Sequence, residues 1–478
     1  MTFTSVYFVV FFVLVIACYY CLDTKPQNRL LLAASYVFYG FWDWRFLALL
    51  IGSTVVDYVA SHKIQSSHSR NARRFWLTTS CLFNLGALAF FKYFDFFIDS
   101  TTRFLSWFGL QADLPVLAII LPVGISFYTF QTLSYTIDVY NNELAPERDF
   151  LTFALYVSYF PQLVAGPIER AKRLLPQLRS TRTVTTRDLS VGISLIGLGY
   201  FKKLAIADVV APAVNAAFFH PDSHNSAVLL AGLYLFSFQI YCDFSAYSDI
   251  ARGCSRLLGI ELMRNFEWPY LSRNITEFWR RWHVSLSTWL RDYVYIPLGG
   301  KGDSHLFTAR NLITTMLLGG LWHGASWTFV AWGGLHGSCL AFHKCVLTRP
   351  TQSHQKKQGR YSPLLFVADC AAVILTFHIV TFGWLLFRSP DFSTVSQYLS
   401  GIASGTGNTS AWILALLPVA MYGGLIFFLD IIQWQNNDET VMLDWPWAWR
   451  GVVWGVMLTI LVMGIGSSEA ADFIYFQF

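Results

Sequence analysis

The chain is poor in charge for its length. Of its 478 residues only 13% are Asp, Glu, Lys or Arg, whereas 54% are hydrophobic and 17% are aromatic. Soluble domains carry about 25% charged residues, so this chain has too little charge to cover a surface that faces water. This scarcity excludes a disordered chain, a coiled coil and an ordinary cytosolic enzyme. Much of the surface must therefore contact lipid.

The chain also lacks the patterns of several site classes. Its eight cysteines show no zinc-ligand or disulfide spacing, and the C-x-x-C of Cys18 and Cys21 lies inside an apolar run, where we expect packing residues. There is no glycine-rich phosphate loop, no G-x-S-x-G and no H-E-x-x-H. The net charge of +5 is small and does not indicate nucleic acid. We therefore expect no bound metal, no resident cofactor and no nucleic-acid partner.

Apolar runs long enough to span a bilayer recur from end to end. The amino-terminal run has no basic region before it and no small-residue cleavage site, so it predicts a first span and not a removable signal. We predict an all-α polytopic membrane protein, residues 1–478 forming one integral-membrane domain, with about ten full spans. The expected spans are 6–22, 30–43, 46–60, 75–97, 114–137, 189–207, 226–248, 362–388, 411–433 and 447–466.

Loop charges predict the orientation, because loops rich in Lys and Arg stay in the cytoplasm. The basic loops, predicted to be cytoplasmic, are 61–74, 169–188 and 346–361. The loops poor in Lys and Arg, predicted to face the other side, are 98–113, 208–225 and 389–410. The alternation closes for all ten spans and leaves both termini outside. Lys202 and Lys203 count against it, because they fall near the outer end of a span.

Two apolar stretches do not fit as simple spans. Stretch 150–168 contains Pro161 and Pro167, which break a helix, and stretch 311–343 is too long for one span and too short for two. Both begin and end beside cytoplasmic segments, so we predict re-entrant or short broken helices. Irregular backbone at membrane depth occurs only where protein buries it or where it lines a water-filled cavity, so these stretches point to an intramembrane cavity. We find no internal repeat and no inverted pair of broken helices, which weakens a transporter interpretation.

The longest non-spanning segment, 249–311, is predicted to be cytoplasmic and contains an amphipathic helix. Asn274 followed by Glu277 resembles a capping box, and Glu277 with Arg281 forms an i,i+4 pair. The apolar residues that repeat at steps of three and four on one predicted helix face are Ile275, Phe278, Trp279, Trp282, Leu286, Trp289, Leu290 and Tyr293. We expect this helix to lie in the membrane interface or to pack on the spans.

A few titratable residues lie where lipid would penalise them. His323 lies in the broken hairpin between glycines, so a functional role is the default interpretation, with a structural histidine as the alternative. His283 lies at the edge of the amphipathic face, where an interfacial histidine is an equal alternative. For His336 and for His378 a packing role is favoured. Asp243, near the end of a span, is expected to pair with a nearby arginine or to orient a loop.

Several blocks resemble a known family. The segment Trp279–Gly300 resembles the signature of the membrane-bound O-acyltransferases, and Gly320–Ala325 resembles that family's catalytic histidine motif. Three further blocks, similar to those of the bacterial alginate O-acetyltransferase subfamily, are Pro122–Gln131, Tyr159–Ile168 and Asp243–Asp249. The resemblance covers nearly the whole chain.

The resemblance implies a helical membrane fold around a central tunnel, in the inner membrane of a bacterium. It implies that His323 and His283 are the catalytic residues and that acetyl-CoA supplies an acetyl group from the cytoplasm. The candidates for binding substrate are Trp282, Ser285, Trp289, Arg291, Trp322 and His336. It also implies contacts with membrane lipid and an extracytoplasmic SGNH-type acetyltransferase partner.

The expected activity is O-acetylation of an extracytoplasmic polysaccharide. Alginate, cellulose, peptidoglycan and other exopolysaccharides remain open, and so does the direct acceptor, a serine or threonine of a partner or a sugar hydroxyl. Two alternatives stay open: transfer of D-alanine or another acyl group from a carrier-protein thioester, and transport of acyl groups or lipids without chemistry.

Overall fold

The computed structural model describes residues 1–111, 115, 117, 119–347, 363–465 and 473–474. Within these residues the regular elements are helices, and none is a strand. The chain divides into two compact units. Unit 1 comprises Met1–Gly197 and Tyr247–Met263, and unit 2 comprises Leu198–Ala246 and Arg264–Phe478. Most of the basic loop expected at 346–361 lies outside the described residues.

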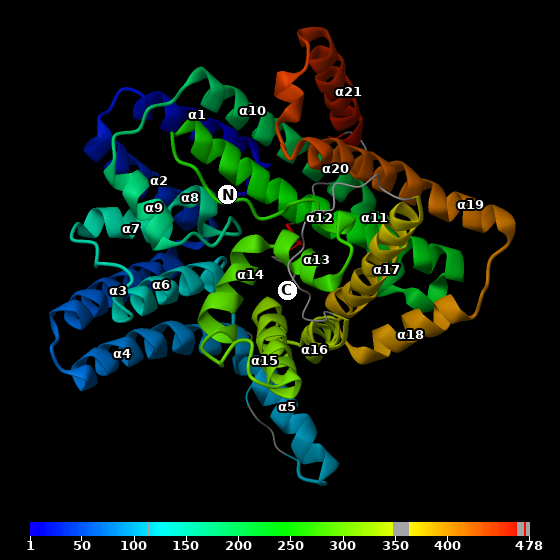
Figure 1. Cartoon of the computed structure of the whole chain (residues 1–478), viewed down its shortest axis with the longest axis horizontal. Helices are drawn as coiled ribbons and strands as arrows, with labels where there is room; N and C mark the ends of the chain where they lie inside the picture. Colours follow the sequence, from blue (N-terminus) through cyan, green and yellow to red (C-terminus); the bar gives the residue numbers. More distant parts are fainter. Residues whose placement is uncertain (112–114, 116, 118, 348–362, 466–472, 475–478) are drawn as a thin grey trace. The chain divides into compact units, whose positions relative to one another are not determined.

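Unit 1 holds the amino-terminal helices (Figure 1). They are α1 (Val6–Tyr19), α2 (Thr24–Asp43), α3 (Leu47–Ser66), α4 (Arg70–Leu88), α5 (Phe94–Trp107), α6 (Ile125–Tyr140), α7 (Phe150–Ser158), α8 (Phe160–Leu163) and α9 (Ala171–Arg179). A 3-10 turn, Trp44–Phe46, joins α2 to α3, and a π-helical turn, Ala89–Tyr93, joins α4 to α5. Helix α10 (Thr186–Tyr200) begins in this unit, and α12 (Ser226–Leu257) ends in it.

A buried polar cluster joins α3, α4 and α6, which lie side by side (Figure 1). Asp57 of α3 is fully buried and accepts hydrogen bonds from Ser80 and Asn84 of α4, the second at 2.9 Å. Thr136 of α6 donates to the same carboxylate at 3.4 Å. A buried carboxylate is tolerated only when donors surround it, so this cluster fixes how the three helices meet.

The stretch 150–168 is broken, as the sequence predicts. Helix α7 ends at Ser158, Tyr159 leaves the helical conformation, and α8 restarts with Pro161 in its first turn. Residues 152–169 are all buried. Protein therefore surrounds this irregular backbone, which satisfies the condition for broken helices at membrane depth.

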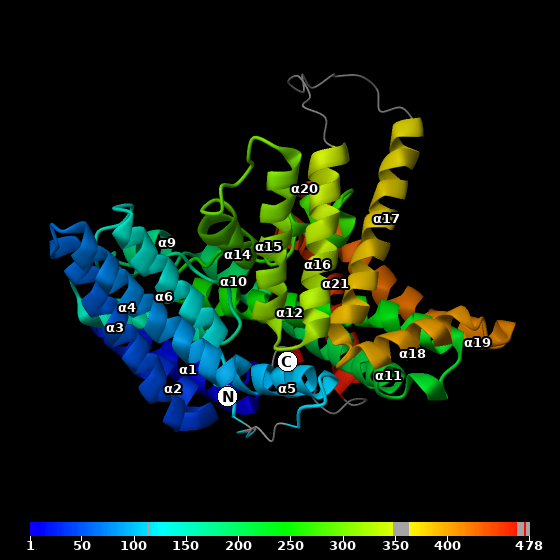
Figure 2. The ribbon, with the colours of Figure 1, turned by 90° about the horizontal axis from the view of Figure 1, so that it is seen from below.

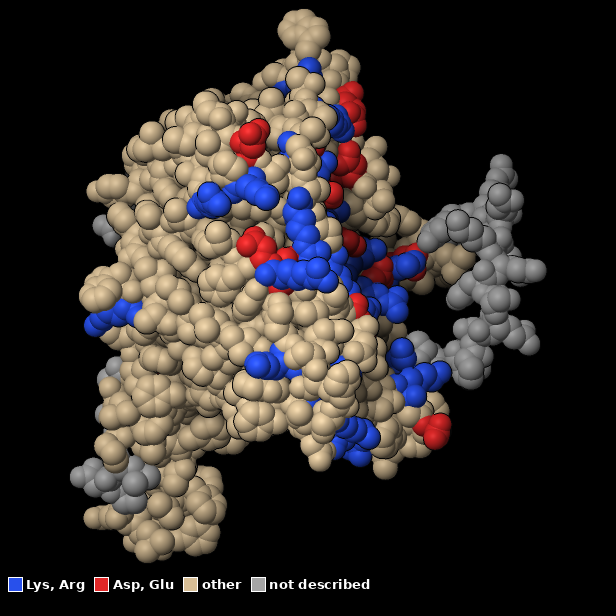
Figure 3. Space-filling model, turned by 90° about the vertical axis from the view of Figure 1, so that its left-hand side faces the viewer, with Lys and Arg blue, Asp and Glu red and all other residues tan. Residues whose placement is uncertain are grey.

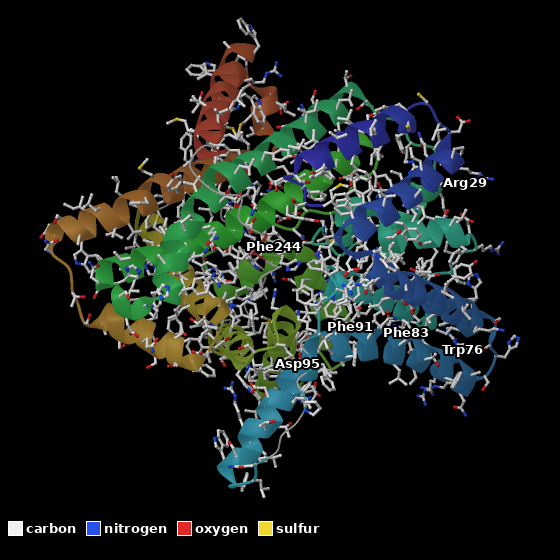
Figure 4. All side chains as sticks on the ribbon, turned by 180° about the vertical axis from the view of Figure 1, so that it is seen from behind. Arg29, Trp76, Phe83, Phe91, Asp95 and Phe244 are labelled. Carbon is white, nitrogen blue, oxygen red and sulfur yellow. The ribbon has the colours of Figure 1, made fainter. Side chains whose placement is uncertain are left out.

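The segment between α5 and α6 differs from the expected span 114–137. Helix α6 begins only at Ile125, because Pro122 cannot continue a helix and Gly124 has a φ of +78°. Asp95, labelled at the start of α5 in Figure 4, accepts a hydrogen bond from the backbone N–H of Leu117 at 3.0 Å. The expected span is thus helical only from Ile125 onward, and the described residues 119–124 before it are not helical.

Unit 2 holds the carboxyl-terminal helices, among which α15, α16 and α17 run side by side (Figure 2). Its α-helices after α10 are α11 (Asp208–Phe219), α12, α13 (Ile275–Arg281), α14 (Val284–Leu290), α15 (His305–His323), α16 (Trp327–Phe342), α17 (Pro363–Arg388), α18 (Phe392–Ala403), α19 (Thr409–Pro418), α20 (Gly424–Asn436) and α21 (Trp447–Ile465). Its π-helical turns are Phe201–Ala207, Arg291–Tyr295, His343–Leu347 and Val419–Gly423. Its 3-10 turns are Pro221–Ser223, Pro269–Leu271 and Val441–Asp444.

Lys203, which disagreed with the predicted orientation, is buried in an ion network. Its Nζ lies 2.8 Å from Asp208 and 2.9 Å from Asp243, and all three side chains are almost fully buried. Asp243 also accepts a hydrogen bond from the backbone N–H of Ile474 at 2.7 Å. The expected partner of Asp243 was an arginine, and the structure gives a lysine instead. Because its charge is paired inside protein, Lys203 does not act as a loop charge.

Seven described helical segments are long and apolar enough to cross a membrane. They are Thr24–Ser66, Arg70–Trp107, Thr186–Phe219, Ser226–Leu257, Pro363–Arg388, Thr409–Asn436 and Trp447–Gly464, and Val6–Tyr19 is a shorter apolar helix. The expected spans 30–43 and 46–60 both fall within the first. On the face shown in Figure 3, Lys and Arg side chains lie mainly in one half, with Asp and Glu among them, and the other half is largely without charge.

Candidate active site

A sharp turn places His283 inside unit 2. Asn274 caps α13 by accepting a hydrogen bond from the backbone N–H of Glu277 at 2.9 Å, and Glu277 pairs with Arg281 at 2.6 Å, which confirms both sequence signals. The prediction of one continuous amphipathic helix is wrong, because α13 ends at Arg281 and α14 begins at Val284. Between them His283 has a φ of +44°, in the left-handed region. The turn leaves the His283 side chain fully buried.

The hairpin expected at 311–343 is formed by α15 and α16; it begins earlier than expected, at His305, and α16 ends at Phe342. His323 is the last residue of α15 and is 4% exposed. The two helices approach closely because glycines face the opposite backbone: a Cβ on Gly320 would lie 2.2 Å from the carbonyl oxygen of Phe329. This close crossing fixes the tip of the hairpin, and therefore His323.

The two candidate catalytic histidines lie together. The ring centroids of His283 and His323 are 6.3 Å apart, although 40 residues separate them in the chain. Phe244, labelled on α12 in Figure 4, stands edge-on to His283 with centroids 4.6 Å apart. Trp332 and Phe387 lie 5.1 and 5.3 Å from His323. Aromatic rings thus surround both imidazoles and limit the access of water.

Complete burial lowers the pKa of His283 to about 3. Desolvation disfavours the charged imidazolium, so His283 is neutral at physiological pH. A neutral imidazole can donate one hydrogen bond and accept another, but it carries no positive charge. This protonation state favours a role in orienting or polarising a substrate over that of a cation.

His336 lies one layer behind this pair. The Nε1–H of Trp279 donates to Nδ1 of His336 at 3.3 Å, and the ring of Trp332 stands 4.8 Å from that of His336. On α17, a Cβ at Gly383 would lie 2.8 Å from Nε2 of His336. His336 therefore touches the aromatic ring that also contacts His323, which places it in the wall of the site.

A cavity of about 440 Å³ opens beside this cluster. It is lined by parts of α13, α14, α15 and α16, including Trp279, which bonds to His336, and Val284, which follows His283. Three cationic side chains line it, those of Arg280, Arg291 and Lys344. Hydroxyl groups of Thr276, Ser287, Thr288, Tyr295 and Thr315 line it as well. Cations and hydroxyls in one cavity suit a ligand that carries phosphate groups.

All eight site candidates lie in the described part of the chain, and Arg291 alone among them lines the cavity. Arg291 is exposed and pairs with Asp292 at 2.8 Å. Trp282 is buried among rings, 4.9 Å from that of Trp384, and Trp322 lies 5.9 Å from His283. Ser285 and Trp289 are buried on α14. Their substrate-binding roles stay predictions.

His378 has a packing role, and Asn265 is an additional residue near the site. His378 is held by two hydrogen bonds, from its Nδ1 to the Ile374 carbonyl at 2.7 Å and from the Tyr234 hydroxyl to its Nε2 at 2.8 Å, as a packing histidine would be. Sequence reasoning missed Asn265, which contacts the turn at His283, because a lone asparagine in a loop carries no spacing signal. In the described residues, no three His, Cys, Asp or Glu side chains are grouped to hold a metal ion.

Comparison with known proteins decides the family. The model of the membrane-bound O-acyltransferase family matches residues 141–386, slightly more than half of the chain. The chain belongs to the membrane-bound O-acyltransferase family. Both histidines and the cavity lie inside the matched range. With its apolar helices, this member of the family is a multi-pass membrane enzyme that transfers an acyl group to a hydroxyl.

Curated relatives of this O-acyltransferase cover nearly its whole length. It is 41% identical to a probable alginate O-acetylase of Azotobacter vinelandii and 34% identical to one of Pseudomonas putida, in both cases over 99% of each chain. It is 34% identical to a peptidoglycan O-acetyltransferase of Helicobacter pylori, over 81% of this chain and 77% of that one.

Proposed function

We propose that this O-acyltransferase moves an acetyl group from cytoplasmic acetyl-CoA across a bacterial inner membrane for O-acetylation of an extracytoplasmic polysaccharide. The observation that carries the proposal is the pairing of His283 and His323 in a closed aromatic site beside a cavity lined by cations. The names of the relatives, which refer to alginate and to peptidoglycan, favour a polysaccharide as the final acceptor.

His323 is the proposed general base. It accepts the proton of the attacking hydroxyl, whose oxygen forms a bond to the thioester carbonyl carbon while the C–S bond breaks. The proton is then passed to the departing sulfur, so CoA leaves as a thiol and the imidazole returns to its neutral form. Protein rings around His323 exclude water, which would otherwise hydrolyse the thioester.

His283 and the cavity hold the donor in this proposal. A neutral His283 donates a hydrogen bond to the thioester carbonyl, where negative charge develops in the transition state. The cavity volume of about 440 Å³ falls within the usual range of ligand pockets. Arg291, with Arg280 and Lys344, attracts the phosphate groups of CoA at the cytoplasmic side.

The direct acceptor is a serine or threonine hydroxyl of an extracytoplasmic SGNH-type partner, or a sugar hydroxyl. A partner would explain how a polymer too large for a membrane site is acetylated. We propose that membrane lipid and this partner are the other components of the system.

Purified protein in lipid nanodiscs tests the proposal by hydrolysis of the thioester, the slow side reaction of an acyltransferase without its acceptor. We expect turnover of acetyl-CoA, its loss in His323→Ala, and its retention in His378→Ala, a matched histidine outside the site. Turnover of a D-alanyl carrier-protein thioester in place of acetyl-CoA would contradict the proposed donor. Equal turnover by wild type and His323→Ala would contradict the chemistry and leave a transporter.

A further inference from the structure

The backbone at His283 adopts a conformation that side chains rarely take. Four described non-glycine residues have a positive φ, and two of them are asparagines, which tolerate the left-handed region. The other two are His283, with φ +44°, and Trp268, with φ +51°. Such strained residues persist only where the surrounding structure holds them, and they concentrate at functional sites. The contacts that hold the backbone of His283 in this conformation are therefore candidates for a functional role.

A short non-helical segment, residues 265–268, lies along the turn and holds it. The backbone N–H of Glu267 donates to the carbonyl of Arg281 at 2.9 Å, and that of Val284 donates to the carbonyl of Asn265 at 3.0 Å. These two bonds lie on either side of His283. The strained residue is thus held by one bond two residues before it and by another at the residue after it.

The segment is itself anchored at its far end. The indole Nε1–H of Trp268 donates to Gln433 at 3.0 Å, and the Arg264 guanidinium lies 4.2 Å from the centre of the Trp268 ring. Arg264 also pairs with Glu439 at 3.2 Å. These contacts, on α20 and just after it, keep the segment from moving with the turn.

The side chain of Asn265 adds the third bond. Its Oδ1 accepts a hydrogen bond from the backbone N–H of Ser285 at 3.2 Å. Asn265 therefore accepts hydrogen bonds from both backbone amides that follow His283, one with its carbonyl and one with its side chain. The side chain is 1% exposed, and its Nδ2 has no hydrogen-bond partner among the described residues. A buried donor without a hydrogen-bond partner destabilises the folded protein. Packing alone would favour an apolar residue here, so the contribution of this asparagine is the hydrogen bond that its oxygen accepts.

We infer that Asn265 is a positioning residue that sets the direction of the His283 imidazole by fixing the left-handed turn. The inference rests on the proposed function of His283. Asn265 acts through the backbone of residues 284 and 285 and not on the substrate. Without its oxygen the turn relaxes toward an ordinary helical conformation, and the imidazole leaves its place against Phe244 and His323.

The test compares Asn265 of segment 265–268 with Asn274, which caps α13, in purified protein with acetyl-CoA as the probe. Asn265→Ala removes one side-chain bond to a backbone amide at the turn, and Asn274→Ala removes the equivalent bond at the start of α13. A displacement of about 1 Å costs on the order of a hundredfold in rate. We expect kcat of Asn265→Ala to fall by about ten- to a hundredfold with KM within twofold. Asn274→Ala should lower the melting temperature and leave kcat within twofold.

A double-mutant cycle with His283→Ala shows whether Asn265 acts through His283 or independently of it. If Asn265 acts through His283, Asn265→Ala causes no further loss of kcat in the His283→Ala background. Multiplicative losses in the double variant, or equal kcat in Asn265→Ala and Asn274→Ala, would overturn the inference while leaving the proposed function intact. Full activity of His283→Ala would instead overturn the proposed role of His283.

Discussion

Replacing Gly333 by alanine is expected to push apart α15 and α16, the two helices of the hairpin that holds His323, the proposed general base. A Cβ at Gly333 of α16 would lie 2.2 Å from the carbonyl oxygen of Met316 on α15, whereas ordinary contact begins near 3.4 Å. The carbonyl oxygen belongs to the backbone of α15, and the Cβ is attached directly to the backbone of α16, so neither atom can turn aside. The helices must therefore separate by about 1 Å, at a cost of about 1–3 kcal/mol. His323 lies at the end of α15, and a shift of about 1 Å there predicts a loss of about a hundredfold in kcat.

Gly334 provides the matched control, because it is the next residue of the same helix. A Cβ there would lie 3.6 Å from a methyl carbon of Leu317, which is an ordinary contact. Alanine is about 0.5–1 kcal/mol more favourable than glycine inside a helix, so Gly334→Ala should keep or raise the melting temperature.

The assay measures thermal unfolding by tryptophan fluorescence and acetyl-CoA turnover on the same nanodisc preparations. We expect Gly333→Ala to have both a lower melting temperature and a lower kcat than Gly334→Ala. The reasoning fails if the two variants agree in both measurements, since the close crossing of α15 and α16 would then not position His323.

Three further changes test other parts of the structure. Lys203→Met leaves two buried carboxylates without their cation, so the free energy of unfolding should fall by about 3–5 kcal/mol. Arg103 of α5 pairs with Asp99 where both side chains are exposed, so Arg103→Met should change the free energy of unfolding by at most about 1 kcal/mol, and thermal melts compare the two variants. Arg291→Gln should raise KM for acetyl-CoA by about tenfold with kcat within twofold, and an unchanged KM would remove Arg291 from the donor site. Gly124→Ala, at a φ of +78°, should lower the melting temperature, whereas Gly86→Ala, with open space around it, should not.

Most of the spans and the two broken stretches could be predicted because hydropathy and proline act locally, whereas the expected span 114–137 begins as a helix only at Ile125. Pro161 predicts the break in stretch 150–168. The length of stretch 311–343 and its glycines predict the hairpin around His323. The seven long helices fall on the expected apolar runs. These features depend on residues that are close in the chain.

The break at His283 could not be predicted from periodicity. The apolar steps of three and four continue from Trp279 through Trp282 to Leu286, because both sides of the break are buried. The break is explained only by hydrogen bonds to a distant segment: Asn265 accepts bonds from the turn, and Glu267 donates one to it. The pairing of Lys203 with Asp243 likewise joins distant residues, and no local pattern encodes it.

The approach of His283 to His323 is also a property of the fold. The resemblance implied that both residues act, while their separation of 6.3 Å and their aromatic surroundings come from the structure. Gly320 and Gly333 contribute to this approach because each faces the backbone of the opposite helix. Glycines beside His323 indicate a close approach in the sequence, but which backbone each one meets is set by the fold.

The most direct measurement of the central claim is the O-acetyl content of extracytoplasmic polysaccharide in cells that express the protein. Acetate released by mild base is compared among wild type, His323→Ala and His378→Ala at equal membrane expression. The account predicts that acetylation is lost in His323→Ala and retained in His378→Ala. Full acetylation in His323→Ala cells would contradict it.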